Sequence, residues 1–153
     1  MEVITSHIQA DFDAFASMLA AKRLHQDAIL VFPGAQEKSL RDYLAQASPS
    51  VASVVQKLKA VKMDKVKRLI IVDTRQISRI GDFAGLIGRN DVEVIVYDHH
   101  PASADDITGV VEHCREYGSN SALMIELLKE KGITPTPEEA TILAMGIFED
   151  TGS

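Results

Sequence analysis

LIIVD at residues 69–73 and VEVIVYDHH at residues 92–100 are the two segments of this sequence that set its architecture. Each is a nearly continuous aliphatic run that leads into an aspartate. Such runs are typical of parallel strands that are buried on both faces of a sheet. A polar residue directly after the run stands at the carboxyl edge of the sheet, where α/β proteins bind their ligands. The sequence therefore predicts a buried parallel sheet with chemistry at one edge.

The rest of the chain alternates between similar runs and helical segments. Further strands are predicted at residues 2–8, 28–32 and 109–111, and helices at 12–24, 39–47, 119–131 and from Thr136 onward. Residues 51–61 carry valine and leucine at helical spacing, which predicts another helix. This alternation predicts one α/β domain over residues 1–153: a doubly wound, mostly parallel five-stranded sheet with helices on both faces.

The composition is that of a soluble globular domain, with 46% hydrophobic and 25% charged residues. No apolar stretch approaches the roughly 18 residues that cross a bilayer, and the N-terminus does not resemble a signal peptide. The lone cysteine, Cys114, excludes an internal disulfide and fits a reducing compartment. The net charge of −6 argues against wrapping nucleic acid by bulk charge. We therefore expect a cytoplasmic protein without membrane contact.

Ligand-type side chains follow three of the predicted strands, although they are far apart in sequence. They are His7 at the end of the first strand with Asp11 and Asp13 after it, Asp73 after the third, and Asp98, His99 and His100 after the fourth. Taken singly, each has an ordinary explanation, such as a helix N-cap for Asp11 or a turn cap for Asp73. Together they predict a metal site, because independent caps are not expected to follow consecutive core strands with ligand-type residues each time.

The donor set indicates which ions such a site would hold. Imidazole mixed with carboxylate suits Mn²⁺, Fe²⁺, Co²⁺ or Zn²⁺ better than Ca²⁺. The central Asp73 could bridge two cations. Two cations about 3.5–4 Å apart activate a water and neutralise phosphoryl oxygens for in-line attack. One histidine of the pair His99-His100 can ligate a cation while its neighbour points to the substrate, and a protonated His100 could donate to a substrate oxygen.

Four motifs resemble those of the DHH phosphoesterase superfamily, in that family's order. They are SHIQADFDA at residues 6–14, VDT at 72–74, DHHP at 98–101 and GIFEDTG at 146–152. The resemblance implies two divalent cations of the Mn²⁺ type, with Mg²⁺, Co²⁺ or Zn²⁺ as alternatives. One cation would be held by His7, Asp11 and Asp73, and the other by Asp13, Asp73, His99 and Asp150. Asp98 would orient a histidine, and His100 would be the substrate-facing residue.

Substrate contacts are predicted in two further places. The loop Tyr117-Gly118-Ser119-Asn120-Ser121 resembles a small-residue family loop before a helix, and its amides could receive a phosphate, with Gly118, Ser119 and Asn120 as the contacts. The plainer alternative makes Ser119 only an N-cap. The polar side of the helix expected at residues 51–61, and the segment just beyond it, is rich in lysine: Lys57, Lys59, Lys62 and Lys65. These lysines form either a solvated face or a contact for RNA phosphates.

The resemblance also sets expectations for the parent protein. Family enzymes carry a C-terminal domain beyond the fourth motif, so we expect the N-terminal domain of a longer protein. Residues 6–21 and 31–34 resemble a bacterial subgroup in which the DHH domain precedes CBS domains and a poly(A) polymerase/CCA-adding tRNA nucleotidyltransferase module.

The expected activity is hydrolysis of phosphate esters in nucleotides or RNA 3′ ends, with a nucleotide or RNA, including tRNA, as partner. Two alternatives stay open. One is a catalytically silent module that binds RNA or a nucleotide for an attached polymerase. The other is a manganese-dependent inorganic pyrophosphatase.

Overall fold

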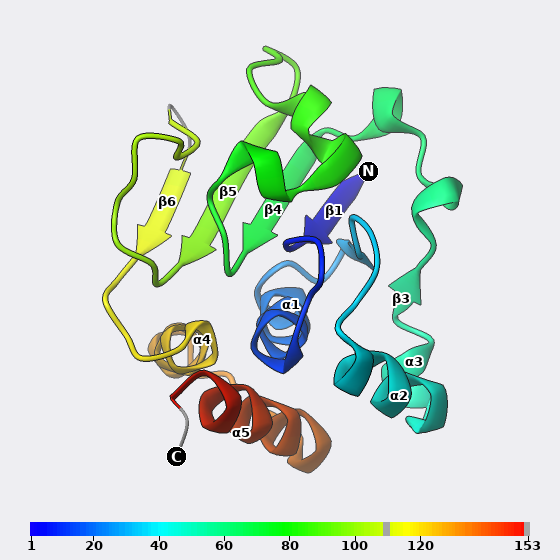
Figure 1. The fold of residues 1–153 in the computed structure, drawn as a ribbon, viewed down its shortest axis with the longest axis vertical. Helices are drawn as coiled ribbons and strands as arrows, with labels where there is room; N and C mark the ends of the chain where they lie inside the picture. Colours follow the sequence, from blue (N-terminus) through cyan, green and yellow to red (C-terminus); the bar gives the residue numbers. More distant parts are fainter. Residues whose placement is uncertain (109–110, 152–153) are drawn as a thin grey trace.

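The structure, a computed structural model, describes residues 1–108 and 111–151. Its centre is one sheet of six parallel strands in the order β3-β2-β1-β4-β5-β6 (Figure 1). The strands are β1 (Glu2–Thr5), β2 (Ile29–Val31), β3 (Val55–Gln56), β4 (Arg68–Val72), β5 (Glu93–Asp98) and β6 (Val111–Cys114). The α/β prediction is confirmed, with one strand more than expected and no antiparallel pair among the strands described.

The extra strand lies where the sequence predicted a helix. Residues 51–61 form the end of a short helix, α3 (Pro49–Ala52), then β3, then a 3₁₀ turn, η1 (Leu58–Ala60). A second 3₁₀ turn, η2 (Met63–Lys65), leads on toward β4. The predicted helix was wrong because the chain turns at Ser53 and Val54, and β-branched Val55 favours an extended chain where a sheet edge is available. The edge is β2, where Leu30 pairs with Val55.

The other predicted elements are present, with small shifts at their ends. The helices are α1 (Phe12–Leu24), α2 (Lys38–Gln46), α4 (Asn120–Glu130) and α5 (Pro137–Thr151). Of the strand expected at residues 109–111, residues 109 and 110 lie outside the described residues, and β6 begins at Val111. Within the part that is described, no helix combines the length and the apolar character needed to span a bilayer.

The two faces of the sheet are covered differently. On one face, α1, α4 and α5 pack over strand residues that include Ile4, Ile70 and Ile95. On the other face, alternate strand residues, including Leu69 and Val94, meet Ile80, Phe83 and Leu86. Ile80 lies between two 3₁₀ helices, η3 (Ile77–Arg79) and η4 (Gly81–Leu86), and Phe83 and Leu86 lie in the second. Figure 1 shows this green segment lying across the sheet, away from the helices.

The strand order creates a switch point between β1 and β4. From β1 the chain moves outward through β2 and β3, and it then returns to β4 on the other side of β1. The connection after β1 carries α1, whereas the connection after β4 carries η3 and η4 over the opposite face. Right-handed crossovers in opposite directions require opposite faces. The two loops therefore lead toward opposite faces from the switch point at the carboxyl edge, which is where such sheets bind ligands.

We expect Phe83→Ala to destabilise the domain by about 3–5 kcal/mol, because a fully buried ring would be removed from a face that has no long helix to close the gap. Urea unfolding followed by circular dichroism measures this loss. The matched control is Ile77→Ala, since Ile77 is 40% exposed and its loss should cost less than about 1 kcal/mol. Equal effects of the two substitutions would contradict this account of the face.

Candidate functional site

The predicted ligands meet at the switch point, although they come from four parts of the chain. His7 and Asp11 lie between β1 and α1, and Asp13 is in the first turn of α1. Asp73 follows β4, His99 follows β5, and Asp150 lies near the end of α5. Ligand atoms of His7, Asp11 and Asp73 lie within 4.8 Å of one another, and so do those of Asp13, His99 and Asp150. The structure thus assembles two adjacent donor groups.

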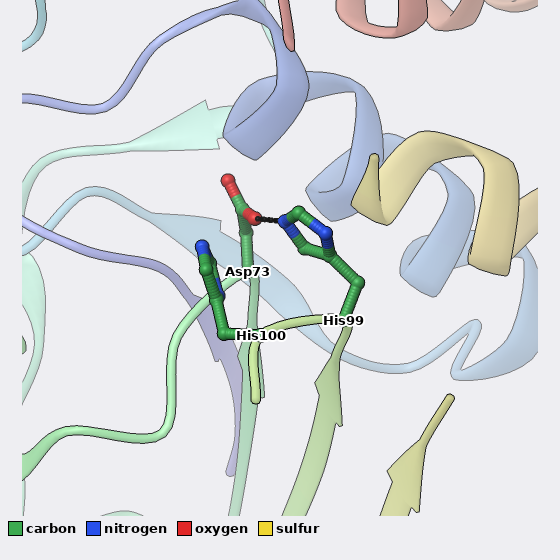
Figure 2. Close-up of side chains that lie close together, drawn as sticks. All are labelled: Asp73, His99 and His100. Carbon is green, nitrogen blue, oxygen red and sulfur yellow. Dashed lines mark ion pairs between the residues drawn. The ribbon is translucent and has the colours of Figure 1, made fainter. Parts of the chain in front are cut away.

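Asp73 belongs to the first group and also faces His99 of the second. Its Oδ2 lies 3.3 Å from Nε2 of His7, and its Oδ1 lies 3.2 Å from Nε2 of His99. Figure 2 shows the rings of His99 and His100 beside the Asp73 carboxylate. The backbone of Asp73 has φ 62°, a left-handed conformation that non-glycine residues rarely adopt. Such conformations persist where the surrounding structure holds them, and they cluster at functional sites.

The tautomers of the two histidines follow from their backbone contacts. Nδ1 of His7 lies 3.0 Å from the carbonyl oxygen of Ile8, and Nδ1 of His99 lies 3.0 Å from that of Tyr117. Because a carbonyl oxygen can only accept, each Nδ1 must carry a hydrogen and donate it. In a neutral ring, Nε2 then presents a lone pair.

Those lone pairs face carboxylates, which are also acceptors. Nε2 of His99 lies 3.2 Å from Asp73, 3.5 Å from Asp150 and 3.9 Å from Asp13. Nε2 of His99 and Oδ1 of Asp73 are both buried without a hydrogen-bond partner. Acceptors that converge in this way need a proton or a cation between them. The residues present therefore fit divalent cations.

Asp13 also binds the start of α4. Its carboxylate accepts hydrogen bonds from the amides of Asn120 (3.0 Å) and Ser121 (2.8 Å) and from the Ser121 hydroxyl (2.6 Å). Ser119 is the N-cap, since its hydroxyl accepts from the Ala122 amide at 3.1 Å. The amides at this helix start, which were expected to receive a phosphate, are thus occupied by the protein itself. A phosphate contact at the exposed Gly118 stays a prediction.

Gly146 allows α5 to approach this corner. A Cβ at that position would lie 3.0 Å from Cα of Asp13 and still closer to Oγ of Ser121. Only a glycine fits the space without displacing the Asp13 carboxylate from α4. The GIFEDTG segment therefore contributes a packing contact as well as the carboxylate of Asp150.

Burial and mutual repulsion shift the proton affinities of the metal-free cluster. Burial and the neighbouring charge of Asp73 raise the pKa of Asp13 to about 7. Burial lowers the pKa of His99, but its contacts with Asp73 and Tyr117 outweigh that effect and raise the pKa to about 9. Asp73 behaves oppositely: burial raises its pKa, but His7 and His99 outweigh it and hold the pKa below its ordinary value.

His100 and Asp98 form a pair beside the cluster. Nδ1 of His100 lies 2.6 Å from Oδ1 of Asp98, which is fully buried, whereas the His100 side chain is 46% exposed. This hydrogen bond raises the pKa of His100 against a smaller opposing effect of burial. A ring nitrogen of His100 lies within 4.8 Å of ligand atoms of Asp73 and His99, so the ring borders the cluster. The His100 ring is therefore anchored by the buried Asp98 on one side and exposed to solvent on the other.

Two arginines at the site were not singled out from the sequence. Nε of Arg75 lies 3.3 Å from Asp98 and 3.2 Å from Asp106, and its guanidinium also donates to the His100 carbonyl oxygen at 2.9 Å. Nη2 of Arg79 lies 3.3 Å from Nδ1 of His7. Their position in the sequence could have indicated a role at the site, because both arginines follow Asp73 in the connection that leaves the carboxyl edge of the sheet.

The lysine-rich segment lies elsewhere. Its four candidate lysines are exposed on the irregular stretch between β3 and β4: Lys57, Lys59, Lys62 and Lys65. They do not share the face of one helix, so the arrangement expected from their spacing was wrong. Their contact with RNA stays a prediction.

The metal-free protein should lose thermal stability as the pH rises from about 6 to about 9. The folded state raises the pKa of Asp13 from 3.8 to about 7 and that of His99 from 6.5 to about 9. A raised pKa stabilises the fold below the unfolded value, and this contribution is lost as the pH rises through the folded value. Thermal unfolding in EDTA measures the trend. An unchanged or rising Tm over this range would contradict it.

We expect Gly146→Ala to destabilise the domain by about 1–3 kcal/mol, because the new methyl group collides with Asp13 and Ser121. Gly85→Ala is the matched control, since a Cβ there would meet nothing within 4 Å. Urea unfolding of both variants tests the close approach. A Gly146→Ala protein as stable as the control would show that α5 does not need this glycine.

Comparison with known proteins places these residues in a family context. Two A-adding tRNA nucleotidyltransferases are similar: that of Geobacter sulfurreducens (strain ATCC 51573 / DSM 12127 / PCA) is 43% identical over 100% of the chain, and that of Aquifex aeolicus (strain VF5) is 31% identical over 94%. The chain spans only 17% and 16% of their respective lengths. A "probable manganese-dependent inorganic pyrophosphatase" of Streptococcus suis (strain 98HAH33) is 23% identical over 97% of the chain and 48% of its own length.

Solved structures show the same fold. An exopolyphosphatase-related protein from Bacteroides fragilis superposes with a TM-score of 0.76 at 22% identity, over 99% of this chain and 46% of its own. The sequence of residues 2–147 matches the DHH family, N-terminal domain. With the motifs in order and the fold shared, the chain belongs to the DHH family.

Proposed function

We propose that this domain is a divalent-metal phosphoesterase that hydrolyses phosphate esters of nucleotides or RNA 3′ ends, with Mn²⁺ as its metal. The observation that carries the proposal is the convergence of two imidazole nitrogens on the buried Asp73 carboxylate, where Oδ1 of Asp73 and Nε2 of His99 lie 3.2 Å apart and neither has a hydrogen-bond partner. Membership of the DHH family supports it. The name of the Streptococcus suis relative supports the choice of manganese.

The proposed ligand sets use the two donor groups described above. His7, Asp11 and Asp73 would hold one cation, and Asp13, Asp73, His99 and Asp150 the other, with one oxygen of Asp73 toward each side. Mixed nitrogen and oxygen donors suit Mn²⁺ and related ions. Bound there, the pair of cations would supply the charge that activates a water and neutralises phosphoryl oxygens.

His100 is the proposed proton donor to the substrate. Its Nδ1–H donates to the buried Asp98 carboxylate, which favours the protonated ring. Nε2–H is then available for a phosphoryl or leaving-group oxygen in front of the cluster. Arg75 holds this pair in place, because it contacts Asp98 and the His100 carbonyl oxygen at once.

RNA or a nucleotide is the proposed substrate class, and the domain is proposed to act at the N-terminal end of a longer protein. The 43% identity to an A-adding tRNA nucleotidyltransferase supports both statements. Nucleotidyl transfer itself would then belong to other parts of such a protein. The exposed lysines between β3 and β4 are the proposed contact for the RNA backbone.

Two substitutions separate metal binding from turnover. Asp73→Asn should lower both Mn²⁺ affinity and hydrolysis of a short oligoribonucleotide by more than about 100-fold, because it removes the negative charge and replaces one of the two oxygens of the carboxylate that the donor groups share. His100→Asn should leave Mn²⁺ binding intact and lower the turnover number by about 10²–10⁴-fold. The matched control is Asp82→Asn, an exposed carboxylate on η4.

Calorimetric titration with Mn²⁺ and product release, both measured on the same preparations, provide the readouts. Unchanged Mn²⁺ affinity in Asp73→Asn would refute the metal site. Wild-type protein that binds Mn²⁺ and RNA but turns over neither oligoribonucleotides nor nucleotides would favour the silent binding module instead.

A second candidate, inorganic pyrophosphatase, is favoured by the similarity to the Streptococcus suis protein over 97% of the chain. Its site would use the same residues, so site variants do not separate the two functions. Phosphate release from pyrophosphate, compared with nucleotide release from RNA at equal enzyme concentration, separates them directly.

A further inference from the structure

We propose that Arg79 binds a second phosphate of the substrate, next to the phosphoryl group that is hydrolysed. The inference rests on the proposed phosphoesterase function and deepens it, because it selects nucleotides and oligonucleotides that carry a neighbouring phosphate over those with a single one.

Nδ1 of His7 has two neighbours that compete for it. Its Nδ1 lies 3.0 Å from the carbonyl oxygen of Ile8 and 3.3 Å from Nη2 of Arg79. Nδ1 cannot donate to the carbonyl and also accept from the guanidinium. When Nε2 of His7 faces a cation, Nδ1 carries the hydrogen, and it then donates to Ile8. The guanidinium of Arg79 thus has no acceptor in His7 and is free to bind another group.

The two arginines of this loop differ in their ion-pair partners. Arg75 is neutralised by Asp98 and Asp106. Across residues 1–108 and 111–151, no carboxylate lies within ion-pair distance of Arg79. Its backbone is nevertheless fixed, because its carbonyl oxygen accepts from the Ile8 amide at 2.8 Å and its amide donates to Gln76 at 3.0 Å. A cation on an anchored backbone without an anionic partner is suited to binding an anion.

Arg79 lies close to the donor groups and to His100. Arg79 and His100 line the same cavity, which has a volume of about 240 Å³. The imidazole of His7 contacts the Arg79 guanidinium through Nδ1 and the Asp73 carboxylate through Nε2. An anion bound by Arg79 therefore lies beside the donor groups and not between them. A phosphoryl group in front of His100 and a second phosphate at Arg79 can belong to one substrate molecule.

The experiment compares two dinucleotides that differ by one phosphate, pApA and ApA, with Mn²⁺-loaded protein. Equilibrium dissociation constants are measured by calorimetry for wild type, Arg79→Gln, Arg79→Lys and Arg89→Gln, each in a His100→Asn background, so that hydrolysis does not consume the dinucleotides during the titration. Arg89 is the control, since it is an exposed arginine paired with Asp91 before the amino end of β5. Mn²⁺ affinity is measured for every variant, which shows whether His7 has been disturbed.

Wild type and Arg89→Gln should bind pApA about tenfold more tightly than ApA, which is the effect of one charge-assisted hydrogen-bonded contact. Arg79→Gln should bind the two dinucleotides equally, with ApA binding and Mn²⁺ affinity unchanged, and Arg79→Lys should restore part of the preference. A tenfold preference that survives in Arg79→Gln overturns the inference alone. Wild-type protein that binds neither dinucleotide overturns the inference together with the proposed function.

Discussion

The burial of one carboxylate, Asp73, between two imidazoles and two further carboxylates is the constraint on which this domain depends. Asp73 is only 4% exposed, and each of its oxygens faces a histidine nitrogen that carries a lone pair in the neutral ring. Such an arrangement is unfavourable unless protons or cations lie between the acceptors. The left-handed backbone of Asp73 adds to that cost. The surrounding structure must therefore be stable enough to hold the cluster together.

Helix starts provide part of the compensation. In the first turn of α1, Asp11 accepts from the Ala14 amide and Glu149 from the Phe12 amide. In the first turn of α4, Asp13 accepts from two amides. These amides would otherwise lack intrahelical partners, and they carry the positive end of the helix dipole. Two helices thus point their positive ends at the acidic cluster, and the same carboxylates that form the site also start the helices.

Topology explains why the site lies where it does. β1 and β4 are neighbours in the sheet, and the connections that follow them pass over opposite faces. The loops after them separate, and the space between them holds His7 and Asp73 without competition from a helix. The loop after β5 then adds His99 and His100, and α5 reaches the same corner because Gly146 permits its close approach to Asp13. Ligands from distant parts of the chain meet as a consequence of strand order.

The sequence by itself determined the buried strands, the main helices and the identity of the cluster residues. Those properties are local: an aliphatic run, a capping residue or an aspartate after a strand can be recognised from its immediate neighbours. What only the tertiary structure decided depends on partners far away in the chain. Val55 extends because β2 offers an edge, and the amides in the first turn of α4 bind Asp13 and not a free anion. Among the described residues, carboxylates pair with Arg75 but not with Arg79. The reason is physical, since hydrogen-bond acceptors and ion-pair partners are consumed by whichever segment folding brings beside them, and sequence spacing does not encode that competition.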